Sequence, residues 1–209
     1  MRILYPMRVK NRKNFVKGKC LVVCNHQSNT DPVLLVTLFW RQMNYMAKSE
    51  LFKSKIAAWF FKIMHCIPVD RSKVDLSSIK AGLRVLNNEK TLVIFPEGTR
   101  KDDSFSENIK DGAAMFAVKT VAPIVPMYFV KKPRPFCFNK LVIGEPIYLD
   151  EEILQDKSKE NIAKVSEIIE AKMLELKQTY VKNKSSKKKN AGAVNETTKT
   201  TEPVQKEQE

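Results

Sequence analysis

Two polar clusters in the sequence carry side chains that could do chemistry. The first, at residues 25–32, reads Asn-His-Gln-Ser-Asn-Thr-Asp-Pro and follows a short apolar run. His26 is one of two histidines in the chain, and histidine can remove a hydroxyl proton near neutral pH. Asp31 could orient the imidazole and stabilise its charged form if the turn folds back, as in a serine-hydrolase triad without the serine. The nucleophile would then be a hydroxyl group of the substrate.

The pairing of His26 with Asp31 also has a purely structural alternative. Asp31 followed by Pro32 is typical of a helix start, with aspartate as the N-cap and proline in the first turn. A histidine and an aspartate five residues apart also occur together by chance. The pair alone therefore leaves both interpretations open.

The second cluster, Pro-Glu-Gly-Thr-Arg at residues 96–100, directly follows the apolar run at residues 91–95. A turn built on proline and glycine lets the backbone approach a ligand closely, and Arg100 could hold a phosphate through two parallel hydrogen bonds. The alternative is a surface turn with an ion pair between Glu97 and Arg100, which would add little stability. A phosphate-bearing substrate fits the first interpretation.

These clusters must be positioned by strands and helices, and the hydrophobic pattern alternates between the two. Runs rich in β-branched residues predict strands at 20–24, 67–69, 91–95, 124–130 and 141–149. Helical patterns occupy 32–40, 51–64, 76–87, 112–119 and 160–180, with Asp75 as the N-cap of the third. The alternation predicts an α/β fold, a single layered domain with a largely parallel, mixed sheet flanked by helices, whose sites lie at strand ends.

The domain organisation follows from a change of composition near residue 182. The sequence of 209 residues is long enough for one well-cored domain, which we place at residues 1–181. Residues 182–209 contain almost no large apolar side chains and form a Lys-rich tail that we expect to be disordered. The tail's seven lysines exceed its four glutamates by three, so most of the net charge of +14 belongs to the domain.

This charge indicates a polyanionic partner, which could be nucleic acid, anionic lipid or a phosphorylated small molecule. A nucleic-acid-binding module is disfavoured because the aromatic residues lie in apolar runs rather than between basic residues; these are Phe39, Trp40, Trp59, Phe60 and Phe61. The four scattered cysteines lack metal-binding spacing and indicate free buried thiols in a reducing compartment. We expect no nucleic-acid partner and no metal site.

Taken together, the two clusters resemble the glycerolipid acyltransferase family, and especially its 1-acyl-sn-glycerol-3-phosphate (lysophosphatidate) acyltransferases. The resemblance rests on Asn25-His26-x4-Asp31 and on Phe95-Pro96-Glu97-Gly98-Thr99-Arg100. Two further blocks match in order, Ile67-Pro68-Val69-Asp70-Arg71 and Ile124-Val125-Pro126-Met127, so the likeness covers roughly residues 8–150. The chain departs from the family at Lys101, where serine is frequent, and at His65, where glycine is frequent.

The resemblance implies a role for each matching residue. His26 would be the general base and Asp31 its partner, while Glu97, Gly98, Thr99 and Arg100 would bind the glycerophosphate end of the acceptor. Arg71 would add a second positive contact. Lys110 is a further phosphate candidate, with an ordinary solvated lysine as the alternative. Val125, Pro126 and Met127 would shape a substrate pocket, with a buried edge strand as the alternative.

The implied reaction moves an acyl group from acyl-CoA or acyl carrier protein to the free sn-2 hydroxyl of 1-acylglycerol-3-phosphate, giving phosphatidic acid. No cofactor is needed, because the thioester is already activated. The alternatives are another lysophospholipid acceptor, or a non-catalytic basic module that binds lipid or nucleic acid. Intact His26, Asp31 and Glu97 disfavour an inactive scaffold.

The sequence also predicts how the protein meets its lipid substrate. The N-terminus lacks the apolar run of a signal peptide, and no window has the length of a spanning helix. We therefore expect a cytoplasmic protein, peripheral on the inner face of an anionic membrane. The helix at residues 51–64 has one apolar stripe with Lys55 and Lys62 opposite, which suits either membrane contact or burial in the core.

Overall fold

The computed structural model describes residues 3–70, 72, 75–96 and 107–196 of the chain, with the backbone alone for 107–110 and 181–196. The described residues form one seven-stranded sheet in the order β1-β7-β6-β2-β5-β3-β4. Neighbouring strands are parallel except for β6 and β7, which are antiparallel. The strands are β1 (Met7–Lys10), β2 (Cys20–Cys24), β3 (Met43–Lys48), β4 (Cys66–Val69), β5 (Thr91–Ile94), β6 (Ile124–Phe129) and β7 (Asn139–Ile143).

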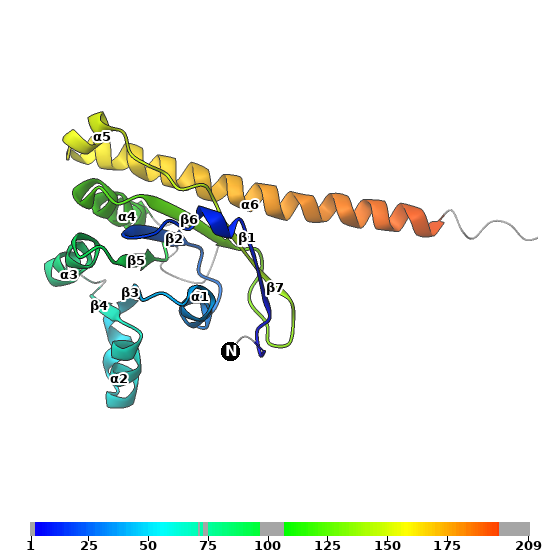
Figure 1. Ribbon diagram of the computed structural model, residues 1–209, viewed down its shortest axis with the longest axis horizontal. Helices are drawn as coiled ribbons and strands as arrows, with labels where there is room; N and C mark the ends of the chain where they lie inside the picture. The colour runs from blue at the N-terminus through cyan, green and yellow to red at the C-terminus, as the bar shows by residue number, and fades with distance from the viewer. Residues whose placement is uncertain (1–2, 71, 73–74, 97–106, 197–209) are drawn as a thin grey trace, which may run out of the picture.

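Helices cover both faces of this sheet (Figure 1). Those on one side are α3 (Leu76–Asn87), α4 (Glu107–Thr120) and α6 (Lys159–Glu196), with the short α5 (Glu151–Gln155) beside α6. On the other side lie α1 (Asp31–Phe39) and α2 (Lys55–Ile63), together with the 3₁₀ turns η1 (Arg12–Asn14) and η2 (Ser49–Phe52). The predicted α/β fold with a mixed, mainly parallel sheet is thus confirmed.

Strand β2 lies at the centre of the core, and each of its five residues is buried. Leu21 and Val23 pack toward α3, α4 and α6, whereas Val22 packs toward Leu35 of α1. A strand with helices on both faces must be apolar on both sides, which explains the unbroken run Cys-Leu-Val-Val-Cys. β2 pairs with β5 and β6, so its carboxyl end lies between theirs.

Several elements differ from the sequence prediction. Strands β1 and β3 and helix α5 were not predicted. The strand expected at residues 141–149 ends at Ile143, because Pro146 has no N–H to donate and the chain returns to the sheet only through a bridge between Ile147 and Ile124. The helix expected at residues 51–64 is divided into η2 and α2.

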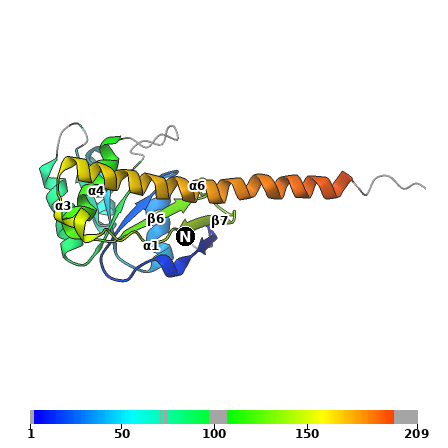
Figure 2. The ribbon, with the colours of Figure 1, turned by 90° about the horizontal axis from the view of Figure 1, so that it is seen from above.

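The long helix α6 also extends beyond its predicted end at residue 180. Its backbone is helical through residues 182–196, where the composition predicts disorder. Figures 1 and 2 show this part of α6 extending past the sheet. Lysine is abundant in this segment, and it favours helix even where no core is present. Residues 197–209 lie outside the described part of the chain.

The cysteines are free, as expected, but they are not all buried. Cys20 and Cys24 are buried, Cys66 is half-buried and Cys137 is exposed. Burial raises the pKa of the Cys66 thiol to about 11. Burial also raises the pKa of Cys20, whose Sγ lies 3.7 Å from the hydroxyl of Thr91. Cys137 corrects the prediction of uniformly buried thiols, because it lies on the loop between β6 and β7.

Candidate active site

The site begins where β2 ends, at the buried side chain of Asn25. Its Oδ1 accepts a hydrogen bond from the backbone N–H of Phe129 at 2.7 Å, and its Nδ2 donates to the carbonyl of Phe129 at 3.0 Å. The nitrogen of the Gln27 side chain donates to the same carbonyl at 3.2 Å. The amide of Asn25 therefore replaces a backbone pair and fixes the turn after β2 to the end of β6.

The carboxylate of Asp31 holds this turn together from the other side. Its Oδ2 accepts the backbone N–H groups of Gln27 and Ser28, each at 2.7 Å. The side chain of Asp31 is fully buried, and such burial is tolerated because charge-assisted hydrogen bonds replace its hydration. Asp31 is the first residue of α1, where the helix dipole also favours negative charge. The carboxylate faces the turn behind it.

This geometry bears on the structural alternative for Asp31, its role as an N-cap. The N-cap of α1 is Thr30, which makes no side-chain cap hydrogen bond, and proline stands in the first turn. The predicted role of Asp31 as N-cap is therefore wrong, although the prediction of a helix start is confirmed. Its side chain instead organises the turn that carries His26.

His26 lies against this carboxylate with its Nδ1 at 3.0 Å from Asp31 Oδ2. The contact assigns the ring proton to Nδ1 in the neutral imidazole, which places the basic lone pair on Nε2. The imidazole side chain is 20% exposed, so it is accessible from solvent while its inner edge is held. A histidine oriented by a buried carboxylate is an arrangement that can serve as a general base.

Aromatic rings support the other side of the imidazole. The centroid of the His26 ring lies 4.5 Å from that of Phe95, and Phe95 in turn lies nearly parallel to Tyr45 at 6.4 Å. The hydroxyl of Tyr45 donates to the carbonyl of Pro32 at 3.0 Å, and burial strongly raises its pKa. Phe95, just after β5, thus contacts the imidazole of His26 directly, and Tyr45 of β3 supports Phe95 from behind.

The second predicted cluster starts beside the first. Val23 pairs with Ile94, so β5 ends next to the turn that carries His26, and the chain continues through Phe95 and buried Pro96. The proposed phosphate ligands Glu97, Gly98, Thr99 and Arg100 lie outside the described residues, as does Arg71. Lys110 lies in α4, where the backbone alone is described.

Two further positions that the sequence analysis singled out, His65 and Pro126, lie among the described residues. His65 is exposed in the turn before β4, and its carbonyl accepts the N–H of Tyr45 at 3.3 Å. Pro126 lies inside β6, between β7 and β2, so the alternative of an edge strand is wrong for this segment. The carbonyl of Pro126 accepts the N–H of Gly144 at 2.8 Å.

Sequence reasoning missed the supporting residues of the site. Asn25 stood in the motif, but its partner Phe129 is 104 residues away and becomes visible only once β2 and β6 are known to pair. The sequence predicts Phe95 only as the last residue of a strand, and its ring contact with His26 depends on the neighbouring turn. Within the described residues, no group of three His, Cys, Asp or Glu side chains could hold a metal ion.

The fold and the His26–Asp31 pair define an α/β protein with a histidine–carboxylate site at the carboxyl ends of parallel strands. Residues 6–130 match the acyltransferase family, and the chain belongs to that family.

Individual relatives extend this likeness over most of the chain. The 1-acyl-sn-glycerol-3-phosphate acyltransferase of Bacillus subtilis (strain 168) is 33% identical over 181 residues, covering 81% of this chain and 87% of the relative. The protein of the same name from Streptococcus pneumoniae is 32% identical over 52% of this chain and 40% of its own length.

A solved structure is similar as well. The crystal structure of the 1-acyl-sn-glycerophosphate (LPA) acyltransferase PlsC from Thermotoga maritima aligns with a TM-score of 0.58 at 27% identity. The alignment covers 82% of this chain and 72% of that protein.

Proposed function

We propose that the protein transfers a fatty acyl group from an acyl thioester to the free sn-2 hydroxyl of 1-acylglycerol-3-phosphate, giving phosphatidic acid for phospholipid synthesis. The donor is acyl-CoA or acyl carrier protein. The observation that carries the proposal is the contact between His26 Nδ1 and buried Asp31 at the end of β2. The relatives named above support the choice of acceptor.

In the proposed reaction, Nε2 of His26 takes the proton of the acceptor hydroxyl as its oxygen attacks the thioester carbonyl. A carbon–oxygen bond forms and the carbonyl becomes a tetrahedral oxyanion. When the carbon–sulfur bond breaks, the imidazolium returns its proton to the departing thiolate. Asp31 stabilises the imidazolium that exists between these steps and keeps the ring in one orientation. No cofactor takes part.

The phosphate of the acceptor is assigned to the turn at residues 97–100. Glu97, Gly98, Thr99 and Arg100 would bind the glycerophosphate, with Arg71 and Lys110 as additional cations. The position of Pro96 beside the turn of His26 supports this assignment, because parallel strands end at the same edge of the sheet. A guanidinium can hold a phosphate with two parallel hydrogen bonds, whereas an ammonium cannot.

The acceptor is tested by measuring acyl transfer from acyl-CoA and from acyl carrier protein to a matrix of lysophospholipids. We expect 1-acylglycerol-3-phosphate to give the highest kcat/KM, with lysophosphatidylcholine and lysophosphatidylethanolamine far lower. Highest turnover with one of the other lysophospholipids would establish the second candidate acceptor class. Transfer to none of them by folded protein would contradict the proposed function.

Arg100→Lys tests the phosphate assignment. Loss of one charge-assisted hydrogen bond costs about 1.5–3 kcal/mol, so we expect the KM for the acceptor to rise by roughly tenfold to a hundredfold. The KM for the acyl donor serves as the internal control and should change little. An unchanged acceptor KM would favour the structural ion pair between Glu97 and Arg100.

The enzyme is proposed to work as a peripheral protein on the inner face of an anionic membrane. No described helix is long and apolar enough to cross a bilayer. Helix α2 has no buried residue, and its exposed side chains include Ile56, Trp59, Phe60 and Ile63. This exposure supports the interpretation of α2 as a membrane contact.

A further inference from the structure

The loop between β6 and β7 carries two exposed phenylalanines. Phe136 is 80% exposed and Phe138 is 93% exposed, although large apolar side chains are usually placed where they lose contact with water. Both lie on the residues 130–138 that connect Phe129 to Asn139. Two aromatic rings on one short loop form a compact apolar tip.

This tip is held in a defined shape. The amide of buried Asn139 accepts the N–H of Arg134 at 2.9 Å and donates to the carbonyls of Arg134 and Cys137, at 3.0 and 2.8 Å. The N–H of Phe136 donates to the carbonyl of Leu4 at 2.7 Å. The exposure of the two rings is therefore built into the loop by hydrogen bonds.

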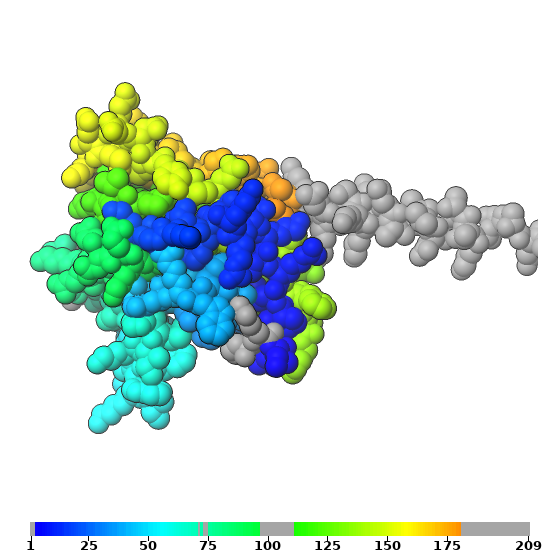
Figure 3. All heavy atoms as spheres, in the orientation of Figure 1, coloured from blue at the N-terminus to red at the C-terminus, as the bar shows by residue number. Residues whose placement is uncertain are grey.

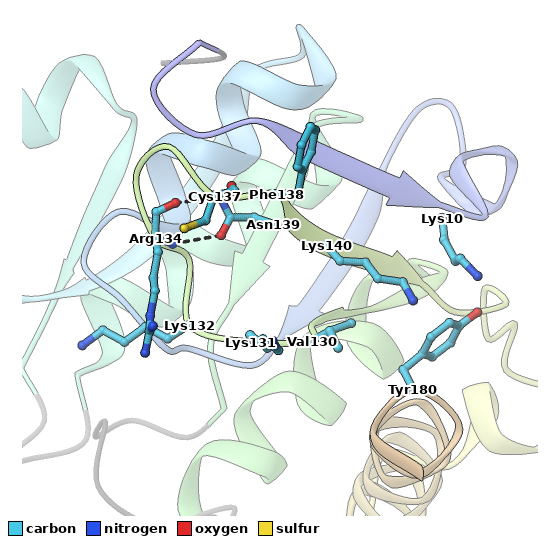
Figure 4. A pocket seen from close by; sticks show the side chains of 10 residues that line it. All are labelled: Lys10, Val130, Lys131, Lys132, Arg134, Cys137, Phe138, Asn139, Lys140 and Tyr180. Carbon is cyan, nitrogen blue, oxygen red and sulfur yellow. Dashed lines mark hydrogen bonds between the residues drawn. The ribbon is translucent and has the colours of Figure 1, made fainter. Parts of the chain in front are cut away.

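Basic side chains surround a cavity of about 960 Å³ beside the tip (Figure 4). The ring of Tyr180 forms one wall, with the ammonium groups of Lys10 and Lys140 at 5.5 and 4.7 Å from its centre. In Figure 4 Phe138 and Tyr180 lie at opposite edges of the cavity, and both line it. The basic residues that line the cavity are Lys10, Lys131, Lys132, Arg134 and Lys140.

Most of the positive charge that lines this cavity belongs to side chains without an ion pair among the described residues. The ion pairs between described side chains involve neither Lys131, Lys132, Arg134 nor Lys10. Such a concentration of like charge favours an anionic ligand. Exposed aromatic residues beside unpaired basic residues are the combination that suits the boundary between lipid headgroups and acyl chains.

The loop is also connected directly to the site. Val130 follows Phe129, whose backbone binds the side chains of Asn25 and Gln27. Figure 1 shows the loop and α2 on the side of the sheet away from α6. The loop therefore begins next to the turn that carries His26.

We propose that the β6–β7 loop docks the protein on anionic bilayers, with Phe136 and Phe138 entering the acyl-chain boundary and the basic cavity binding lipid headgroups. The inference rests on the proposed function, because the proposed acceptor is a membrane lipid and the enzyme must reach the bilayer to bind it. It adds a second contact, next to the catalytic turn, to the one proposed for α2.

Flotation of the full chain with phosphatidylcholine vesicles, with and without phosphatidylglycerol, tests the proposal without any turnover. Phe136→Glu/Phe138→Glu should lower binding to anionic vesicles by at least roughly tenfold, as expected for two lost aromatic contacts. Lys131→Gln/Lys132→Gln/Arg134→Gln should lower it by roughly fivefold for each charge. Neither variant should change turnover with a water-soluble short-chain acceptor.

Matched controls are available elsewhere on the surface. Tyr148→Glu/Leu174→Glu places the same charges on exposed apolar positions away from the loop, and Lys119→Gln/Lys157→Gln/Lys159→Gln removes the same number of exposed charges. Both controls should float like the wild type. If the double phenylalanine variant does not fold, the single Phe138→Glu variant, changed at the more exposed position, takes its place in the flotation assay.

Two results would overturn the proposal. Unchanged flotation of a folded Phe138→Glu or double variant would exclude the loop as a docking element. Release of wild-type protein from vesicles by coenzyme A, with no comparable release by inorganic phosphate, would assign the cavity to the donor. Failure of the acyltransferase assay alone would leave the flotation result unaffected, so the two proposals can fail separately.

Discussion

At the scale of single residues, Asp31 is the organising group of the site. One of its oxygens binds two backbone N–H groups of the turn and also contacts His26. Its other oxygen is buried with no donor among the described residues. The proposed mechanism makes the imidazole cationic, and the buried carboxylate beside it would stabilise that cation.

His26→Ala should lower kcat/KM by about 10²–10⁴, because general-base assistance contributes that much to a rate. Asp31→Asn should lower it by a similar or smaller factor, since the amide retains the shape of the side chain but not its charge. Both are measured with 1-acylglycerol-3-phosphate and an acyl thioester, with circular dichroism to establish folding. Near wild-type activity of folded His26→Ala would contradict the proposed mechanism.

The sequence indicates the candidate reactive residues but not the residues that hold them in place. His26 and Asp31 were predictable because their spacing is local and one turn can bring them together. Asn25 and Phe129 are joined through neighbouring strands, and the spacing of residues along the chain does not reveal which strands are neighbours. Supporting contacts of this kind depend on the topology of the sheet.

At the scale of elements, the predictions that held were those with strong local patterns. Helix α3 spans Leu76–Asn87 as predicted, and Asp75 accepts hydrogen bonds from the N–H groups of Ser77 and Ser78 as its N-cap. The Ser77 hydroxyl is the main cause of the lowered pKa of Asp75, and backbone N–H groups add to it. Capping of this kind involves residues that are neighbours in the sequence, so it can be predicted from the sequence alone.

Strand β3 shows why other elements could not be predicted. Its sequence, Met-Asn-Tyr-Met-Ala-Lys, has no β-branched residue and contains methionine, alanine and lysine, which favour helix. It forms a strand because it pairs with both β4 and β5 and because Met43 and Tyr45 are buried in the core on one face of the sheet. Packing against neighbouring strands overrides the local preference, and this information is distributed over the whole chain.

The contact between α3 and α4 gives a test at the same scale. A Cβ added to Gly82 would lie 2.6 Å from the buried ring of Phe116. Crowding of a packed core costs about 1–3 kcal/mol, whereas replacing a helical glycine by alanine gains about 1 kcal/mol. Gly82→Ala should therefore lower the free energy of unfolding by up to about 2 kcal/mol, measured by denaturant titration.

Gly112→Ala is the matched control for Gly82→Ala. A Cβ at Gly112, also within a helix, would meet no atom of the described residues within 4 Å. Only the gain in helix propensity remains, so the free energy of unfolding should rise by up to about 1 kcal/mol. Equal effects of the two substitutions would show that the glycine at position 82 is not required by the packing of Phe116.

At the scale of the whole molecule, the exposed apolar side chains are unevenly distributed. Many of them lie on α2 and on the loop between β6 and β7, while α6 covers the opposite side of the sheet. Figure 3 shows α2 projecting from the body of the protein. A helix that filled the core would be buried along one face, but α2 has no buried residue.

The pattern on α2 therefore predicts a membrane contact that can be removed by substitution. Trp59 and Phe60 are 65% and 43% exposed, so Trp59→Glu/Phe60→Glu changes the surface without opening the core. Loss of two aromatic side chains from a lipid interface should lower binding to anionic vesicles by roughly tenfold or more. Tyr148→Glu/Leu174→Glu should bind like the wild type.

Two further experiments test α2, one that varies the salt concentration and one that removes the C-terminal tail. Binding of the wild-type protein should weaken as salt rises, because basic residues attract anionic lipid only within a screening length of roughly 10 Å. A chain truncated after Tyr180 should keep most of its binding, since α2 remains. If truncation abolished flotation while the folded Trp59→Glu/Phe60→Glu variant floated normally, the membrane contact would belong to the lysine-rich tail and the proposed role of α2 would be wrong.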